Sequence, residues 1–148
     1  MTRKPIVFLK HLEGAAYAPV IEKTLEQIGF FQTVAPGARV FLKPNLTFPQ
    51  FRPGVMTSLE CLRAVTVCLI GRGYRVVIGE ADSGGYNRFS IDEVFKGMGI
   101  DQLAAETGAE IVNVSFTERE WMEVRAGWRT LRVPVPWTRD RSRRAFFS

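Results

Sequence analysis

The chain has 148 residues, of which 46% are hydrophobic, and its formal net charge at pH 7 is +5. This length corresponds to about one domain of roughly 100–200 residues, and a chain of this size can bury a sizeable core. No apolar run approaches the roughly 18 residues of a membrane span, and the apolar run near the N-terminus is shorter than the roughly 7–15 residues of a signal-peptide core. We therefore expect a cytoplasmic protein without membrane partners.

The positive charge is concentrated at the C-terminal end. Residues 1–124 hold 13 basic and 14 acidic side chains, a net charge of −1, whereas residues 125–148 hold seven arginines and only Asp140, a net charge of +6. We expect an α/β domain over residues 1–124 and a basic, aromatic-containing segment over residues 125–148. Such a segment can contact nucleic acid, but a dedicated nucleic-acid binder usually carries a basic face on the fold itself. Nucleic acid is therefore the less favoured partner.

The predicted elements follow from apolar periodicity, caps and turn residues. Short apolar runs predict strands, and capping boxes of the Thr-x-x-Glu or Ser-x-x-Glu type predict helix starts. In chain order, we first expect a strand over 5–10, a helix from near Pro19 to Gly29, a strand over 39–43 and a loop over 44–56. A helix from Thr57–Glu60 to about Ile70 and a strand over 74–80 follow. The remainder should form helical segments from Ser90–Glu93 to about Thr107 that break near Gly97 and Gly99, a strand over 109–115, and a hairpin over 121–135 that turns at Ala126 and Gly127.

Strands that alternate with helices indicate an α/β fold with right-handed crossovers. Continuous apolar runs such as Val40–Leu42 and Val76–Ile78 are typical of parallel strands, which are covered on both faces. We therefore predict a three-layer α/β domain that has a largely parallel sheet, flanking helices and a hairpin-like C-terminal extension. The strands over 39–43 and 75–80 should be parallel and should end at the same edge.

Polar residues follow the predicted strands at the edge where open parallel sheets bind ligands. Lys43 supplies a positive charge and Asn45 supplies a donor and an acceptor, while Pro44 fixes the backbone between them. We predict a site for a small anionic ligand. Its catalytic candidates are Lys43, Asn45 and Glu80; its ligand-binding candidates are Lys10, Thr57, Asp82, Ser83, Gly84 and Gly85; Asn113 and Ser115 lie at the same rim, and no residue is assigned as a metal ligand.

Each candidate also has a purely structural interpretation. Lys43 can be a solvated strand end, and Asn45 can form an Asx-turn. Thr57 can cap a helix, although a helix N-terminus also attracts anions. Glu80 and Asp82 can be ordinary loop carboxylates, a general-base pair or a divalent-metal pair. A non-catalytic interaction module therefore remains an alternative to an enzyme, and whether the protein is an enzyme stays open.

The two cysteines, Cys61 and Cys68, lie seven residues apart in a predicted helix. Two helical turns correspond to a rise of about 10 Å, which is too long for a disulfide. No Cys-x-x-Cys motif occurs in the chain, so we expect no iron–sulfur cluster and no cysteine-based zinc site.

Three stretches of the sequence are similar to a known family. "PGARVFLKPNL", "GVMTSLECLRAVTVCLIGRGYRVVIGEADSGG" and "GIDQLAAETGAEIVNV" resemble the family called domain of unknown function 362, over roughly residues 4–115. By this resemblance, the family pattern includes Lys43, Pro44, Asn45, Thr57, Gly79, Glu80, Ser83 and Gly84. The family name implies no reaction.

This chain departs from the family pattern in two ways. Many relatives carry a ferredoxin-like cysteine cluster, and relatives continue through a second lobe with a Lys-x-His element; both are missing from this sequence. The resemblance therefore implies a first lobe whose residues 125–148 are a truncated remainder. We expect such a lobe to be catalytically incomplete alone and to associate with itself or with a second-lobe polypeptide.

Overall fold

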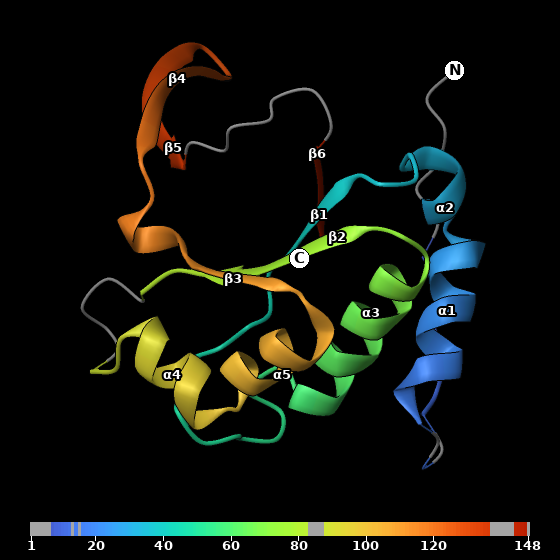
Figure 1. Ribbon diagram of the computed structural model, residues 1–148. Helices are drawn as coiled ribbons and strands as arrows, with labels where there is room; N and C mark the ends of the chain where they lie inside the picture. The colour runs from blue at the N-terminus through green and yellow to red at the C-terminus, as the bar shows by residue number, and fades with distance from the viewer. Residues whose placement is uncertain (1–6, 13, 15, 83–87, 137–143, 148) are drawn as a thin grey trace.

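The computed structural model describes residues 7–12, 14, 16–82, 88–136 and 144–147. Helices and strands alternate along most of this length (Figure 1). The elements are α1 (Tyr17–Gln27), α2 (Phe30–Thr33), β1 (Arg39–Leu42), α3 (Leu59–Gly71), β2 (Arg75–Glu80), α4 (Ile91–Gly97), α5 (Ile100–Thr107), β3 (Glu110–Asn113), the 3₁₀ helix η1 (Val114–Phe116), β4 (Arg119–Ala126), β5 (Arg129–Pro136) and β6 (Arg144–Phe147).

The main sheet is parallel and has the strand order β3-β2-β1-β6. Leu42 of β1 lies opposite Ile78 of β2, so the two strands run side by side toward a common carboxyl edge. At that edge Glu80 of β2 lies opposite Asn113 of β3. The α/β class, the parallel sheet and the parallel pairing of the strands near 39–43 and 75–80 are confirmed.

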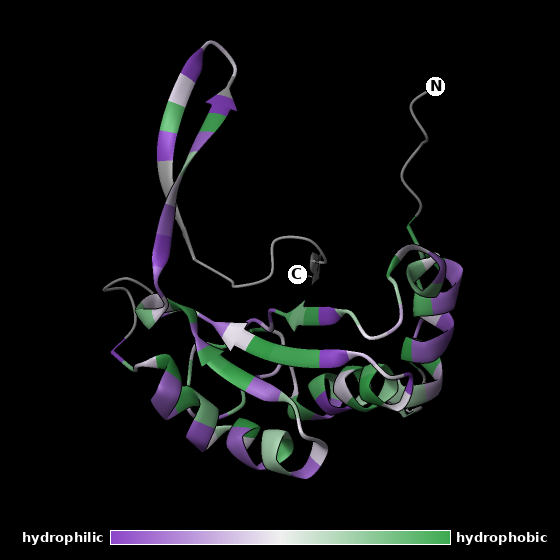
Figure 2. Ribbon diagram, turned by 45° about the horizontal axis from the view of Figure 1, so that its top comes forward, coloured by the Kyte–Doolittle hydropathy of each residue, from purple (hydrophilic) through white to green (hydrophobic). Residues whose placement is uncertain are grey.

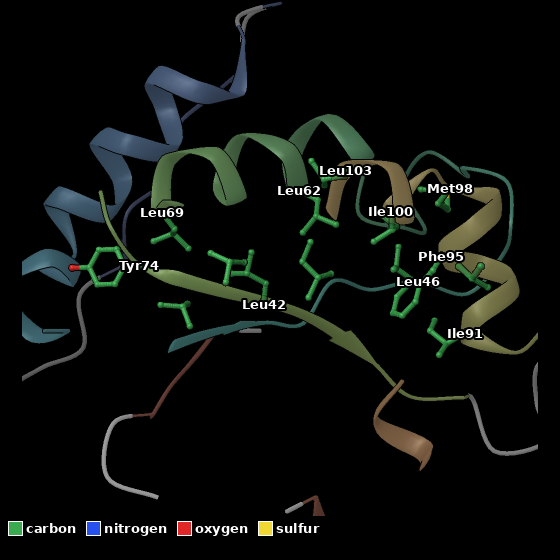
Figure 3. Packing of buried hydrophobic residues seen from close by; sticks show 14 of the residues in the cluster. Leu42, Leu46, Leu62, Leu69, Tyr74, Ile91, Phe95, Met98, Ile100 and Leu103 are labelled. Carbon is green, nitrogen blue, oxygen red and sulfur yellow. The ribbon is translucent and has the colours of Figure 1, made fainter. Parts of the chain in front are cut away.

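The core lies between this sheet and the helices. Alternate residues of β1, Val40 and Leu42, are buried, while Arg39 and Phe41 are only partly buried on the opposite face. Helix residues complete the core, among them Leu69, Phe95 and Leu103 (Figure 3). Burying a side chain of this size stabilises the fold by about 1.5–3 kcal/mol.

In the described part of the chain, the α-helices cover only one face of the sheet (Figures 1 and 3). On the second face, the guanidinium of Arg39 reaches across β2 to the carboxylate of Glu110. The flanking helices that the sequence predicts are therefore present, and in the described residues they pack on the face of the sheet that holds the core. None of the described helices has both the length and the apolar character needed to cross a bilayer.

The structure corrects the prediction of a strand over residues 5–10. Residues 7–10 form no strand, and residues 5 and 6 lie outside the described residues. The apolar side chains of this run are exposed, with Val7 at 86% and Leu9 at 92%. The neighbour of β1 on the side away from β2 is β6, which comes from the other end of the chain. An apolar run predicts that a segment can pair, but it does not predict which of two such segments takes the single free edge of β1.

The helix boundaries follow local chemistry at most positions. The Ser90–Glu93 capping box is confirmed, because Glu93 N–H donates to Ser90 Oγ and Ser90 N–H donates to Glu93 Oε2. The predicted helix break is also confirmed, since α4 ends at Gly97 and the left-handed Gly99 (φ 71°) precedes α5. This conformation is readily open only to glycine.

The predicted hairpin is confirmed as β4 and β5, which pair antiparallel from Arg119 opposite Pro136 to Ala126 opposite Arg129, but its turn is Gly127 and Trp128, one residue later than the predicted Ala126 and Gly127. The hairpin crosses the composition boundary that was predicted after residue 124. It projects away from the helices and the main sheet (Figures 1 and 2) and forms a separate two-stranded sheet.

Candidate functional site

The segment after β1 continues the alternation of the strand. Lys43 and Asn45 are exposed, whereas Pro44 and Leu46 are buried. Side chains that alternate along an extended chain point to opposite sides. Pro44 and Leu46 therefore extend the apolar side of β1, and the two polar residues are left on the accessible side of the carboxyl edge.

Lys43 and Glu80 meet at this edge. Lys43 Nζ donates to Glu80 Oε2 at 2.8 Å, and the N–H of Ala81 donates to Glu80 Oε1 at 2.9 Å. The Glu80 side chain is only 10% exposed, whereas that of Lys43 is 48% exposed. A carboxylate so far removed from water needs such partners. The pair therefore joins a half-exposed lysine side chain to a nearly buried glutamate side chain.

Asn45 ties the two ends of the loop over residues 45–57 together. Its backbone N–H donates to Thr57 Oγ1 at 3.0 Å, its Nδ2 donates to the Val55 carbonyl at 2.7 Å, and its carbonyl accepts the Thr57 N–H at 3.0 Å. These three bonds place the start of α3 beside the end of β1. Asn45 and Thr57 are thus brought together, and both contribute to the geometry of the loop.

The structure corrects the prediction that Thr57 caps the helix α3. The N-cap of α3 is Ser58, whose Oγ accepts the Cys61 N–H at 3.1 Å. Thr57 and Ser58 are adjacent and are both good caps. The hydroxyl of Thr57 instead accepts the Asn45 N–H, a long-range contact that a local pattern cannot reveal.

The middle of the same loop is packed against α4. A Cβ at Gly97 would lie 2.4 Å from the Pro49 carbonyl oxygen, so glycine is required at this contact. Phe48 packs edge-on against Phe89, and the guanidinium of Arg52 lies 3.7 Å from the centre of the Phe48 ring. The loop is therefore held both by its closing hydrogen bonds and by aromatic contacts.

Asp82 joins three elements at the carboxyl edge. Its Oδ1 accepts the N–H of Ile91 at the start of α4 at 2.7 Å, and its own N–H donates to Ser115 Oγ at 2.8 Å. Asn113 Nδ2 lies 3.4 Å from Asp82 Oδ1 and 3.2 Å from Asp92 Oδ2. Asp82 thus fixes β2, η1 and α4 relative to one another. Sequence reasoning missed Asp92, whose position in the first turn of α4 was the available signal.

Several predicted site residues lie elsewhere. Lys10 is exposed and does not follow a strand, because residues 7–10 form none. Ser83, Gly84 and Gly85 lie outside the described residues. Among the residues that the structure describes, no three histidine, cysteine, aspartate or glutamate side chains are grouped so that they could hold a metal ion.

A groove of about 770 Å³ lies between α1 and α3, and none of the predicted site residues lines it. Its walls are mostly small or apolar, including Tyr17, Pro19, Val67 and Cys68. Both cysteines are free and partly buried. Burial raises the pKa of the Cys68 thiol, and the Glu22 carboxylate raises it further. The groove is thus distinct from the polar edge of the sheet.

Comparison with known proteins places β2, β3, the hairpin and most of β1 in one family pattern. The family model described as "Domain of unknown function (DUF362)" matches residues 40–138. This match begins in β1 and includes Lys43, Asn45, Thr57, Glu80 and Asp82. No curated protein matches the chain.

Proposed function

Because the chain belongs to the DUF362 family, whose name records no reaction, we propose a function from the site itself: the carboxyl edge of the sheet binds a small anionic molecule through Lys43. The observation that carries this proposal is the Lys43–Glu80 pair. Replacing a largely buried ion pair with apolar side chains is often neutral or stabilising, so such a pair is weak evidence of a role in stability. A lysine that shields a nearly buried glutamate and still offers half of its surface to solvent is better suited to a ligand than to stability.

In this proposal each residue has a separate role. Lys43 Nζ has three donors, of which Glu80 takes one, so the others can donate to an anionic group. Glu80 then accepts a proton from the bound molecule or balances a cation that accompanies it. Asn45 and Thr57 position the loop, and Asp82 positions α4 and η1. Ser83, Gly84 and Gly85 remain predicted ligand-binding residues that lie outside the described part of the chain.

The test uses inorganic phosphate as the probe and thermal unfolding as the measurement. A ligand that binds only the folded state raises the midpoint as its concentration exceeds the dissociation constant. We expect phosphate to raise the midpoint of the full chain and to have no such effect on Lys43→Ala. Lys23→Ala, which removes an exposed lysine of α1, is the matched control and should respond like the unmodified chain.

Two results would contradict the proposal. One is a midpoint that phosphate leaves unchanged in the unmodified chain. The other is a Lys43→Ala protein that responds to phosphate as strongly as the Lys23→Ala control.

A non-catalytic interaction module is the second candidate. The β4–β5 hairpin favours it, because Trp121 is 60% exposed and Trp128 is 84% exposed. Large apolar side chains that gather on one accessible element usually mark an interaction site. This function would use a surface separate from Lys43 and Glu80, so both functions can reside in one chain.

A further inference from the structure

The two outer edges of the β4–β5 hairpin are chemically different. The loop between the strands has two residues, Gly127 and Trp128, so the flanking pair Ala126 and Arg129 exchanges hydrogen bonds. Hydrogen-bonded and non-hydrogen-bonded residue pairs then alternate along the two strands. Pro134 and Pro136 fall in the pairs whose backbone groups point outward, so two outward N–H groups are missing from the edge of β5. Proline on an edge blocks the addition of a further strand.

The edge of β4 has no such block. The same alternation directs the N–H and C=O groups of Arg119, Trp121, Glu123 and Arg125 outward, and none of these residues is proline. Within the described residues, β4 has β5 as its only strand neighbour. The hairpin therefore carries one edge that is closed to strand addition and one that is open.

Among the described residues, no third strand supports the hairpin. An isolated two-stranded hairpin is marginally stable, and three or more strands with an apolar face are required for independent stability. One face of the hairpin carries Met122, Val124 and Leu131, which are 50%, 44% and 47% exposed. Addition of strands at the β4 edge would supply the missing neighbours.

We propose that β4 pairs antiparallel with β4 of a second copy of this chain and forms a four-stranded sheet, β5-β4-β4-β5. In a pairing about a two-fold axis, the outward backbone N–H and C=O groups of one β4 must face the outward groups of the other β4. This requirement limits the possible registers. A register centred on Met122 would place Arg119 opposite Arg125 of the second copy, and one centred on Glu123 would place that carboxylate opposite itself. Like charges directly opposite each other are destabilising, so these two registers are disfavoured.

A register centred on Val124 also pairs opposite charges, but the register centred on Trp121 adds an aromatic pair to them. It places Arg119 opposite Glu123 of the second copy, twice by symmetry, and it places Trp121 opposite its own equivalent. Opposite charges and aromatic pairs are both favourable across strands. This complementarity of β4 with itself identifies the occupant of the open edge as a second copy rather than an unrelated strand.

The principal test compares two proline variants by sedimentation of the full chain. Glu123→Pro removes an outward N–H from β4, and Arg132→Pro removes one from β5. Glu123 and Arg132 are directly opposite in the hairpin, so both variants lose the same cross-strand pair and carry proline at the same level. We expect a dimer for the unmodified chain and for Arg132→Pro, and at least tenfold weaker association for Glu123→Pro. A monomeric unmodified chain at high micromolar concentration, or equal association of the two variants, would overturn the proposal.

A charge-reversal pair tests the register and does not depend on tolerance of proline. Arg119→Glu places like charges opposite each other in the Trp121-centred register and should weaken association about tenfold. Arg125→Glu is the matched control, because in that register Arg125 lies beyond the paired residues. A register centred on Val124 would pair Glu123 with Arg125 instead, and would reverse the two results. That reversal, or insensitivity of association to both changes, would refute the pairing proposed here.

Discussion

Replacing Gly79 with alanine should destabilise the sheet directly beneath the candidate site. A Cβ at this position would lie 2.5 Å from two ring carbons of Phe41 and 2.8 Å from Val112 Cγ1. Non-bonded carbon atoms pack at about 3.5–4.0 Å, so the ring would have to move by roughly 1 Å. Overpacking of this kind costs about 1–3 kcal/mol. We expect Gly79→Ala to lower the free energy of unfolding by about 2 kcal/mol.

Urea denaturation of four proteins measures this effect and assigns its cause: the unmodified chain, Gly79→Ala, Phe41→Ala and the double variant. If the Phe41 ring causes the clash, Gly79→Ala should cost about 1 kcal/mol or less in the Phe41→Ala background, because only Val112 then crowds the new methyl group. Gly71→Ala is the control. Gly71 lies in α3 with nothing within 4 Å of a Cβ, so this change should be neutral or stabilising by up to about 1 kcal/mol.

The close approach of Phe41 to Gly79 would be refuted by either of two outcomes. Gly79→Ala could match the unmodified chain in its urea midpoint. Alternatively, its cost could be the same with and without the Phe41 ring, in which case the glycine would be required for another reason.

Two further predictions concern charges. Glu80→Gln removes the carboxylate that shares the Lys43 ammonium group, so the affinity for inorganic phosphate, measured by titration calorimetry, should rise about two- to fivefold; a weaker affinity would contradict competition between Glu80 and the anion for Lys43 and would assign the larger effect to the proton that Glu80 accepts. Burial raises the pKa of the Cys61 thiol and the Glu60 carboxylate raises it further. Glu60→Gln should therefore lower this pKa and speed alkylation of Cys61 by iodoacetamide near pH 8, whereas Cys68, followed in parallel by mass spectrometry, should react at an unchanged rate.

The elements that the sequence predicted correctly are those whose signals are local. The Ser90–Glu93 capping box needs only four consecutive residues, and the hairpin needs a two-residue turn between alternating strands. The parallel pairing of β1 and β2 follows from the helix between them, since a single crossover returns the chain in the same direction. These features depend on neighbouring residues or on general topology.

The features that the sequence missed depend on competition between distant segments. The run near residues 5–10 and the segment that forms β6 are both candidates for the edge of β1, and the sequence carries no signal that ranks them. Thr57 and Ser58 are equally suitable caps in isolation. The choice between them rests on the Asn45 N–H, which lies 12 residues away along the chain and reaches Thr57 only in the folded loop.

The candidate site was predictable in part for the same reasons. The meeting of Lys43 with Glu80 follows from two parallel strands that end at one edge. The hydrogen bonds of Asp82 do not follow from the sequence, because they require β2, η1 and α4 to converge. Sequence reasoning therefore found the residues at the edge but not the division between those that hold the scaffold and those that remain accessible.

That division bears on the Lys-Pro-Asn segment. Pro44 is buried, and Asn45 uses its N–H, its carbonyl and its Nδ2 in the hydrogen bonds that close the loop. Folding alone therefore accounts for both residues. Lys43 is different. Its partner Glu80 is nearly buried, and an apolar pair of similar volume would serve stability as well or better than an ion pair in such a place. A requirement of folding therefore explains the proline and the asparagine but leaves the lysine and the glutamate unexplained. The function of this segment is therefore best sought at the ion pair that Lys43 forms with Glu80.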